Sequence, residues 1–220
     1  MAATDISELI ARCQLFSGLT PAELRPLAAR CRLRLLNAGE RLASNDDIFA
    51  VSRGLMRITG AVNDAAVSWL SATGQFFGSL DFRGRRRQSF EGVALTPTEL
   101  VAIPQSAFDR FTTERPHALR TALNALTEKL QEERELRSLM HLPSGDRMLA
   151  TLVFLYRRVG PRIPMTRAAI AEMTGLARET SIRSLSPYEK RGFIHTRRGV
   201  IEVVRPAELQ KALESRLSAR

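Results

Sequence analysis

Cysteine and histidine are scarce in this chain, which contains two cysteines and three histidines among its 220 residues. Two cysteines are too few for a disulfide scaffold, and such sparse usage fits the reducing cytoplasm. They also exclude an iron–sulfur cluster held by four thiolates of one subunit. For a haem, His117, His141, Cys13 and Cys31 are possible ligands, and no spacing singles any of them out. We therefore predict no cofactor and no metal site.

Long apolar runs and catalytic motifs are missing as well. No apolar run reaches the roughly 18 residues that a membrane-spanning helix needs. The N-terminus lacks a basic start followed by an apolar core, so no signal peptide is expected. The chain has no GxxxxGK[ST] loop, no GxSxG elbow and no His/carboxylate metal pattern. These features predict a cytoplasmic protein without a membrane partner, without catalytic residues and without enzymatic activity.

Positive charge, in contrast, is abundant and unevenly placed. The chain has 33 basic and 23 acidic residues, and 33 − 23 gives a net charge of +10. Residues 143–220 hold 15 basic and 7 acidic residues, a surplus of 8, which leaves 18 and 16 for residues 1–142. A basic C-terminal part beside a nearly neutral N-terminal part indicates a polyanionic partner. A solvated basic face of an arginine-rich chain is the alternative.

A pair of short helices about a glycine turn is predicted within residues 165–194. Thr166 is a natural N-cap for the first helix, and Gly175 provides an unhindered turn. The second helix begins near Ala177, and we expect Ile182 and Leu185 to face inward. Its N-terminal end carries Arg178, Glu179, Thr180 and Arg183. This is the helix-turn-helix arrangement, whose second helix fits the major groove of DNA.

The same stretch resembles the winged helix of the CRP/FNR transcription regulators. The recognition helix of that family carries an Arg-Glu-Thr/Ser pattern and then Arg, which here are Arg178, Glu179, Thr180 and Arg183, after the turn at 174–176. Segments 15–24 (LFSGLTPAEL), 38–40 (AGE) and 74–80 (GQFFGSL) are similar to the family's sensor domain in the same order.

The resemblance implies an α+β fold with two domains. Residues 1–115 would form a β-roll sensor domain, cyclic-nucleotide-binding-like, with N-terminal helices. Residues 116–142 would form a long dimerisation helix, and residues 143–220 a winged helix-turn-helix domain. Glycines punctuate short apolar runs from residue 33 to residue 103, a pattern typical of small antiparallel β-structure, which agrees with this expectation.

The expected DNA contacts fall into three groups. Arginine can form two hydrogen bonds to guanine and glutamate can accept one from cytosine, so Arg178, Glu179 and Arg183 are the base-reading candidates, with Thr180 beside them. The resemblance implies that Thr166 and Arg167 hold phosphate. The hairpin predicted at 193–204 would be the wing, and its tip residues Arg197 and Arg198 can neutralise phosphates. A local ion pair of Glu179 with Arg183 is the alternative for Glu179.

Pro187 conflicts with a long second helix. Proline lacks the N–H that would bond the carbonyl of Arg183, and in a helix interior this costs about 3 kcal/mol. We therefore expect the recognition helix to span residues 177–186 and to break near Ser186. If the break impairs DNA reading, the protein would instead be a protein–protein interaction module.

The cyclic-nucleotide pocket of the family is not matched at its key positions. The corresponding segments are 78–80 and 88–90, so the effector-pocket candidates are Gly78, Ser79, Leu80, Gln88 and Ser89. Ser79 replaces the carboxylate that grips a ribose hydroxyl, and Gln88 replaces the cation that faces the phosphate. We expect that cyclic AMP binding is absent, which makes an effector-independent regulator the first alternative. The arginines at 83 and 85–87 are a candidate site for an acidic ligand, a nucleotide second messenger or the transcription machinery such as RNA polymerase, with a solvated loop as the alternative.

Dimerisation is predicted from leucine spacing. Four leucines recur at intervals of 4, 3 and 4 residues, as in the seam of a coiled coil: Leu119, Leu123, Leu126 and Leu130. An intramolecular core helix is the alternative. The prediction is a homodimer that binds a pseudo-palindromic site in double-stranded DNA, with two half-sites about one helical turn apart.

Overall fold

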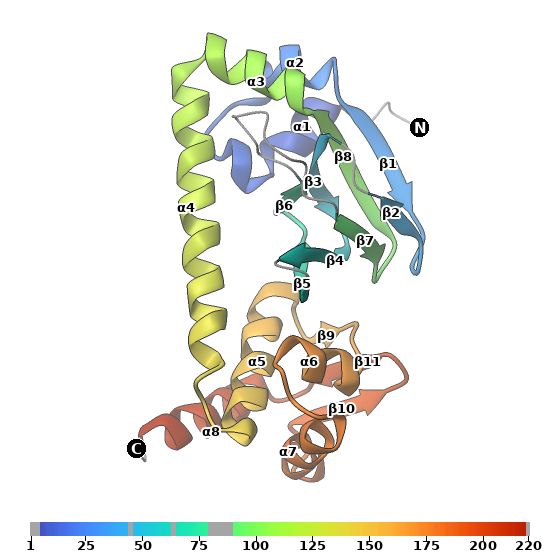
Figure 1. Ribbon diagram of the computed structural model, residues 1–220, viewed down its shortest axis with the longest axis vertical. Helices are drawn as coiled ribbons and strands as arrows, with labels where there is room; N and C mark the ends of the chain where they lie inside the picture. The colour runs from blue at the N-terminus through green and yellow to red at the C-terminus, as the bar shows by residue number, and fades with distance from the viewer. Residues whose placement is uncertain (1–4, 44–45, 63–64, 79–89, 219–220) are drawn as a thin grey trace. The chain divides into compact units, whose positions relative to one another are not determined.

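The computed structural model describes residues 5–43, 46–62, 65–78 and 90–218 (Figure 1). The chain forms two compact units, Met1–Lys129 and Leu130–Arg220. The division falls inside the long helix α4, Pro116–Leu139. Within the described residues, no helix is both long and apolar enough to cross a membrane.

Short helices open the N-terminal unit. They are α1 (Ile6–Ala11), the 3-10 helix η1 (Gln14–Phe16) and α2 (Pro21–Ala28). The Thr20 hydroxyl accepts from the backbone N–H of Glu23, and the Glu23 carboxylate accepts from the N–H of Thr20, so the two residues form a capping box. These two bonds satisfy first-turn donors that the helix itself leaves without partners.

Two antiparallel sheets follow, as the β-roll prediction requires. One has the order β1-β8-β3-β6 and the other β2-β7-β4-β5. Their strands are β1 (Arg32–Leu36), β2 (Arg41–Ala43), β3 (Asp47–Arg53), β4 (Leu55–Val62), β5 (Ala65–Ala72), β6 (Phe76–Gly78), β7 (Phe90–Ala94) and β8 (Thr98–Pro104). Among the described strands of these two sheets, β4 and β5 are paired and consecutive, whereas the other pairs, such as β1 with β8 and β2 with β7, join strands that are distant in the chain.

Two apolar cores stabilise this unit. The first joins the N-terminal helices to α3 (Gln105–Glu114), where Phe16 and Phe108 meet edge to face with ring centroids 6.1 Å apart. The second lies between the sheets and contains three phenylalanines. Phe49 and Phe77 stack at 5.2 Å, and Phe90 meets Phe77 edge-on at 5.7 Å. Aromatic pairs in these geometries add about 0.5–1.5 kcal/mol beyond the burial of their area.

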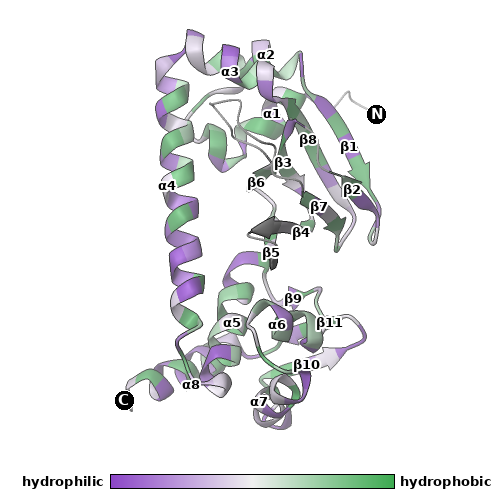
Figure 2. Ribbon diagram, viewed as in Figure 1, coloured by the Kyte–Doolittle hydropathy of each residue, from purple (hydrophilic) through white to green (hydrophobic). Residues whose placement is uncertain are grey.

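Helix α4 presents two different faces. Ala118, Ala122 and Ala125 are buried in the core that contains Phe16, and Leu126 packs on the same core. Apolar residues are frequent in its first half and polar residues prevail in its second half (Figure 2). The helix is therefore in part the intramolecular core helix named as the alternative, and its remaining leucines lie on other faces.

The described part of the C-terminal unit contains four helices besides the end of α4. These are α5 (Ser144–Val159), α6 (Arg167–Met173), α7 (Arg178–Lys190) and α8 (Pro206–Ser218). Strands β9 (Arg162–Ile163), β10 (Ile194–Arg197) and β11 (Val200–Val203) form a small antiparallel sheet in the order β10-β11-β9. Arg158 on α5 pairs with Glu132 on α4 at 2.6 Å. The predicted winged helix-turn-helix architecture is confirmed.

The expected helix break at Pro187 is wrong. Helix α7 continues through Pro187 to Lys190, so the helix is longer than the predicted 177–186. The buried side chains of Leu185 and Tyr188 flank the proline and pack the helix on both sides of it. This packing offsets the missing hydrogen bond, because tertiary contacts routinely override local propensity. Ile182 is a second correction, since it was expected to face inward but is 40% exposed.

Candidate nucleic-acid interface

Helix α6 and the turn after it are defined by local hydrogen bonds. The Thr166 hydroxyl accepts from the N–H of Ala169 at 3.0 Å, which confirms the predicted N-cap. Thr174 ends the helix, and its buried hydroxyl donates to the carbonyl of Ile170 at 2.9 Å. Gly175 then adopts φ +62°, a left-handed conformation that favours glycine. These contacts turn the chain sharply into α7.

Helix α7 is anchored on its inner face. The buried Ser181 hydroxyl donates to the carbonyl of Arg167 at 3.0 Å and so joins α7 to α6. Leu185 is fully buried, and Tyr188 packs beside Phe193 with ring centroids 6.4 Å apart. Sequence reasoning missed Ser181, although its place between exposed arginines on a helix is a signal for an inward-facing small residue.

The base-reading candidates lie on the outer face of the same helix. Arg178, Glu179 and Arg183 are exposed, and Thr180 is half-buried. The N-cap residue Ala177 has no side-chain acceptor, so it makes no capping hydrogen bond to the first N–H groups of α7. The side chains and the positive end of the helix dipole are thus presented together. Contact with DNA itself stays a prediction.

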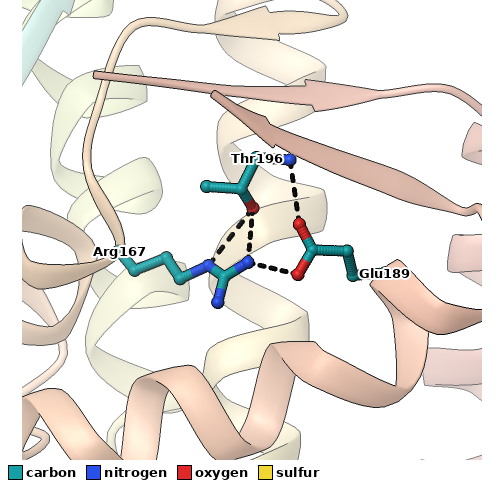
Figure 3. Close-up of polar contacts among 3 residues, drawn as sticks. All are labelled: Arg167, Glu189 and Thr196. Atoms are coloured by element: carbon teal, nitrogen blue, oxygen red, sulfur yellow. Dashed lines mark hydrogen bonds and ion pairs between the residues drawn. The ribbon is translucent and has the colours of Figure 1, made fainter. Parts of the chain in front are cut away.

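Arg167 occupies a different position from the one expected of a phosphate contact. Its Nε and Nη2 atoms donate to the Thr196 hydroxyl at 3.2 and 2.8 Å, and Nη2 also pairs with the Glu189 carboxylate (Figure 3). The second carboxylate oxygen of Glu189 accepts from the backbone N–H of Thr196 at 3.1 Å. We call these three residues the wing tether, because they join the start of α6, the end of α7 and strand β10.

The charge of Glu189 is stabilised within the wing tether. Partial burial raises the pKa of Glu189, but the hydrogen bonds from Arg167 and Thr196 together lower it by more than burial raises it. This pKa therefore lies below its ordinary value. The Arg167 side chain is only 19% exposed. The guanidinium thus already has a carboxylate and a hydroxyl as partners, and its first role in the structure is to position the wing.

The wing is a β-hairpin with a two-residue turn. Arg197 pairs with Val200 at the end of β10 and β11, and Gly199 adopts φ +77° in the turn. Arg197 and Arg198 are exposed at this tip, as predicted. Type I′ and related turns require positive φ and suit the twist of paired strands, which explains the glycine.

Arg147 is a positioning residue that the sequence did not reveal. Its guanidinium donates to the carbonyl of Leu142 through Nε and Nη2, at 3.2 and 3.0 Å. Its Nη1 atom donates to the carbonyl of Thr174 at 3.0 Å. One side chain therefore connects the segment between α4 and α5 to the turn of the helix-turn-helix.

The effector-pocket candidates lie only in part among the described residues. Gly78 ends β6 with φ +110°, and a Cβ atom there would lie 2.5 Å from the carbonyl oxygen of Asp47. Ser79, Leu80, Gln88 and Ser89 lie outside the described residues, as do the arginines at 83 and 85–87. Phe90, directly after this stretch, packs against the core between the sheets.

The cysteines and histidines are placed as ordinary structural residues. Cys13 and Cys31 are buried and free, and burial raises the pKa of each thiol to about 12. His117 lies 3.4 Å from the Glu23 carboxylate, and His141 is exposed. No group of three or more potential metal ligands occurs in the part of the chain that the structure describes.

The predicted dimerisation leucines divide between two environments. Leu123 is 50% exposed and Leu130 is 56% exposed, whereas Leu119 is half-buried and Leu126 packs on the core of its own unit. Leu123 and Leu130 are two helical turns apart and so share one face of α4. The dimer itself stays a prediction.

Comparisons with known proteins agree with this architecture. A Crp-like helix-turn-helix domain matches residues 146–212. The nitrogen fixation regulation protein FixK from Bradyrhizobium diazoefficiens is 28% identical over 211 residues, which cover 88% of this chain and 87% of that protein. The cyclic AMP receptor protein from Thermus thermophilus is 25% identical over 205 residues, covering 90% of this chain and 95% of that protein.

Solved structures share the fold. The structure of FixK2 from Bradyrhizobium japonicum superposes with a TM-score of 0.67 at 19% identity, covering 82% of this chain and 96% of that one. This likeness shows the fold alone. The matches to the helix-turn-helix domain and to the two relatives are similarities of sequence. By name, those relatives are a regulation protein and a receptor protein.

Proposed function

The chain belongs to the CRP/FNR family of transcription regulators, and we propose that it binds a pseudo-palindromic DNA site as a cytoplasmic homodimer. In this proposal the exposed end of α7 enters the major groove, and each subunit reads one half-site. The half-sites lie about 34–36 Å apart, one turn of the duplex, because a two-fold symmetric dimer repeats its contacts on one side of the DNA.

One observation carries this proposal. Arg178, Glu179 and Arg183 are exposed together on the first turns of α7, and the opposite face of that helix is buried. Guanidinium groups so placed can form two parallel hydrogen bonds to guanine, and the carboxylate can accept from cytosine. Thr180, beside them, supports the same surface. Four charged or polar side chains on one short helix, which is anchored by its buried face, match the requirements of base reading.

Phosphate contacts surround this surface in the proposal. The exposed Arg197 and Arg198 at the wing tip are the main candidates, and the exposed Thr166 lies at the start of α6. Arg167 takes a positioning role instead, since Glu189 and Thr196 already bind its guanidinium. These contacts supply affinity without sequence preference and orient the protein on the duplex.

The homodimer is proposed from the exposed leucines of α4. Leu123 and Leu130 share one face, and large exposed apolar side chains at such spacing favour a coiled-coil seam. The alanines at 118, 122 and 125 face the core of the same subunit, so the two faces of the helix serve different partners. RNA polymerase and an unidentified small-molecule effector complete the proposed partners.

We also propose that the sensor unit does not bind cyclic AMP. The space between its sheets contains the stacked rings of Phe49 and Phe77, with Phe90 edge-on against both. A ribose phosphate needs polar partners, and this interior offers apolar ones. An effector-independent regulator is therefore the favoured second candidate. The interaction-module alternative depended on a break at Pro187, and α7 has none there.

The test begins with selection of duplexes from a random pool on the full-length protein. The affinity for a selected and a scrambled duplex is then measured by fluorescence anisotropy at several salt concentrations. We expect pseudo-palindromic sites, a clear preference for them and a steep salt dependence. Arg183→Ala should weaken binding to the selected site by about 1–3 kcal/mol and relax one base position in each half-site. Added cyclic AMP should leave the affinity unchanged.

Arg157→Ala is the matched control, because Arg157 is exposed on α5 and no ion pair to it occurs among the described residues. Removal of one arginine there should alter neither affinity nor preference. Failure to enrich any sequence, or equal effects of Arg183→Ala and Arg157→Ala, would contradict the proposed function.

A further inference from the structure

A groove of about 480 Å³ opens in the C-terminal unit beside the proposed base-reading surface. Its walls come from the first turn of α5, one face of α7 and the second half of α8. These elements lie at the same end of the unit (Figure 1). Helix α8 follows the wing and lies outside the helix-turn-helix motif, so the motif alone gives it no role in DNA binding.

The walls of the groove carry an excess of positive charge. Arg183 contributes from α7, Arg191 from the C-cap position directly after α7, and Arg216 from α8. Arg183 and Arg191 are exposed, and no hydrogen bond or ion pair to either guanidinium occurs among the described residues. The remaining polar wall positions are mostly hydroxyl groups, including Ser144 on α5 and Ser215 on α8. Guanidinium and hydroxyl donors together suit an anionic oxygen ligand.

The structure holds Arg216 in place at this groove. Its Nη1 atom donates to the Asp146 carboxylate at 2.6 Å, and its guanidinium also interacts with the Tyr188 hydroxyl. Gly145 leaves room for the contact, since a Cβ atom there would lie 3.3 Å from Nη1. The Arg216 side chain is still 52% exposed, so donors remain for an incoming group. A pre-positioned guanidinium loses less freedom on binding than a mobile one.

The groove is continuous with the surface proposed to read bases. Arg183 and Thr180 belong to both, and Arg191 lies about two helical turns beyond Arg183 on the same side. A DNA duplex that presents its bases to α7 therefore has its nearest phosphate groups within reach of this groove. A free phosphorylated small molecule shares the chemistry but does not account for this continuity.

We propose that this groove binds the sugar–phosphate backbone of the same duplex whose major groove receives α7, with Arg191 and Arg216 as phosphate contacts. The inference rests on the proposed function and extends it, because it makes α8 part of the DNA-binding face. These contacts add affinity and salt dependence without altering which bases are preferred.

The experiment measures the binding constant of full-length protein for a selected and a scrambled duplex across a range of salt concentrations. Arg191→Gln should lower the slope of log K against log salt by about 0.9 for each phosphate that the arginine neutralises in the wild type. The substitution should also lower the binding constants for both duplexes by the same factor. Arg157→Gln, which removes an exposed arginine from the far end of α5, should leave the slope and both affinities unchanged.

Arg216 needs a paired variant, because Arg216→Gln alone would leave the mostly buried Asp146 carboxylate without its cation. The double variant Asp146→Asn, Arg216→Gln keeps a neutral hydrogen-bonding pair, and circular dichroism checks that it folds. It should reproduce the slope change of Arg191→Gln. The single variant Asp146→Asn, which retains the guanidinium, should keep the wild-type slope.

Three results would overturn the inference. The first is that Arg191→Gln and the double variant keep the wild-type salt slope while Arg183→Ala abolishes the sequence preference. This result would refute the inference and leave the proposed function standing. A weaker affinity for the selected duplex alone would make these residues base readers instead. Calorimetric binding of adenosine monophosphate that the variants abolish, with unchanged DNA slopes, would make the groove a nucleotide site. A wild-type protein without any sequence preference would instead refute the proposed function.

Discussion

The wing tether predicts that Glu189→Ala destabilises the C-terminal unit and weakens DNA binding together. The substitution removes the acceptor for the Thr196 N–H, at 3.1 Å, and the carboxylate partner of Arg167. A hydrogen bond to a charged group contributes about 1.5–3 kcal/mol, and we take the lower end because these side chains are partly exposed. Two such bonds, weakened by solvent, give a decrease in unfolding free energy of about 2 kcal/mol.

This decrease is large enough to measure by thermal unfolding. In a unit of this size, each kcal/mol corresponds to a shift in Tm of about 4–8 °C, so we expect Tm to fall by about 8–16 °C. Glu189→Gln keeps an oxygen that can accept from Thr196 but removes the ion pair, so its effect should be about half as large. DNA affinity should fall with stability, because the wing is then joined to α7 by fewer bonds.

Glu172→Ala provides the matched control. Glu172 is an exposed glutamate on α6, so its removal changes the net charge equally without touching the tether. Unfolding of both variants is followed by circular dichroism, and their affinity for a selected duplex by fluorescence anisotropy. The reasoning is refuted if Glu189→Ala is no more destabilising than Glu172→Ala, or if it leaves affinity intact.

The same tether makes a prediction about pH. The folded protein holds the pKa of Glu189 below its ordinary value of 4.5, because hydrogen bonds from Arg167 and Thr196 outweigh the effect of burial. A lowered pKa contributes stability that is present above the unfolded value and disappears as the pH falls through the folded value. The difference in unfolding free energy between wild type and Glu189→Gln should therefore be constant at neutral pH and shrink below about pH 4.5. A difference that grows on acidification contradicts this assignment.

Two further predictions concern α4 and α7. The double variant Leu123→Arg, Leu130→Arg should convert the proposed dimer to a monomer in sedimentation velocity without unfolding the protein, because both side chains are at least half exposed. The control Leu35→Arg, at a 69% exposed position on β1, should leave the molecular mass unchanged. An unaltered dimer mass in the α4 variant would rule out that face as the interface. Pro187→Ala restores an N–H for the carbonyl of Arg183 and should stabilise the protein by about 1–2 kcal/mol, after allowance for the added freedom of the unfolded chain. A lower stability in urea unfolding would show that the proline ring makes a packing contribution instead.

Local features of this protein follow from the amino-acid sequence alone. The capping box at Thr20, the N-cap at Thr166 and the turn at Gly175 each depend on residues within three or four positions of one another, so their signals could be read directly. The arginines of α7 and of the wing tip were predicted in the same way. Their chemistry depends on the residue type and on exposure, which the periodicity of the neighbouring apolar residues indicates.

The way these pieces support one another depends on the packing of distant segments. Arg167 finds Glu189 across 22 residues and Thr196 across 29, and Arg216 finds Asp146 across 70. No spacing rule connects such partners, because their meeting depends on how α5, α6, α7 and α8 pack. Pro187 shows the opposite case, in which a correct local rule yields the wrong helix end. The backbone there follows the burial of Leu185 and Tyr188, since the free energy of packing a helix face exceeds that of one missing exposed hydrogen bond.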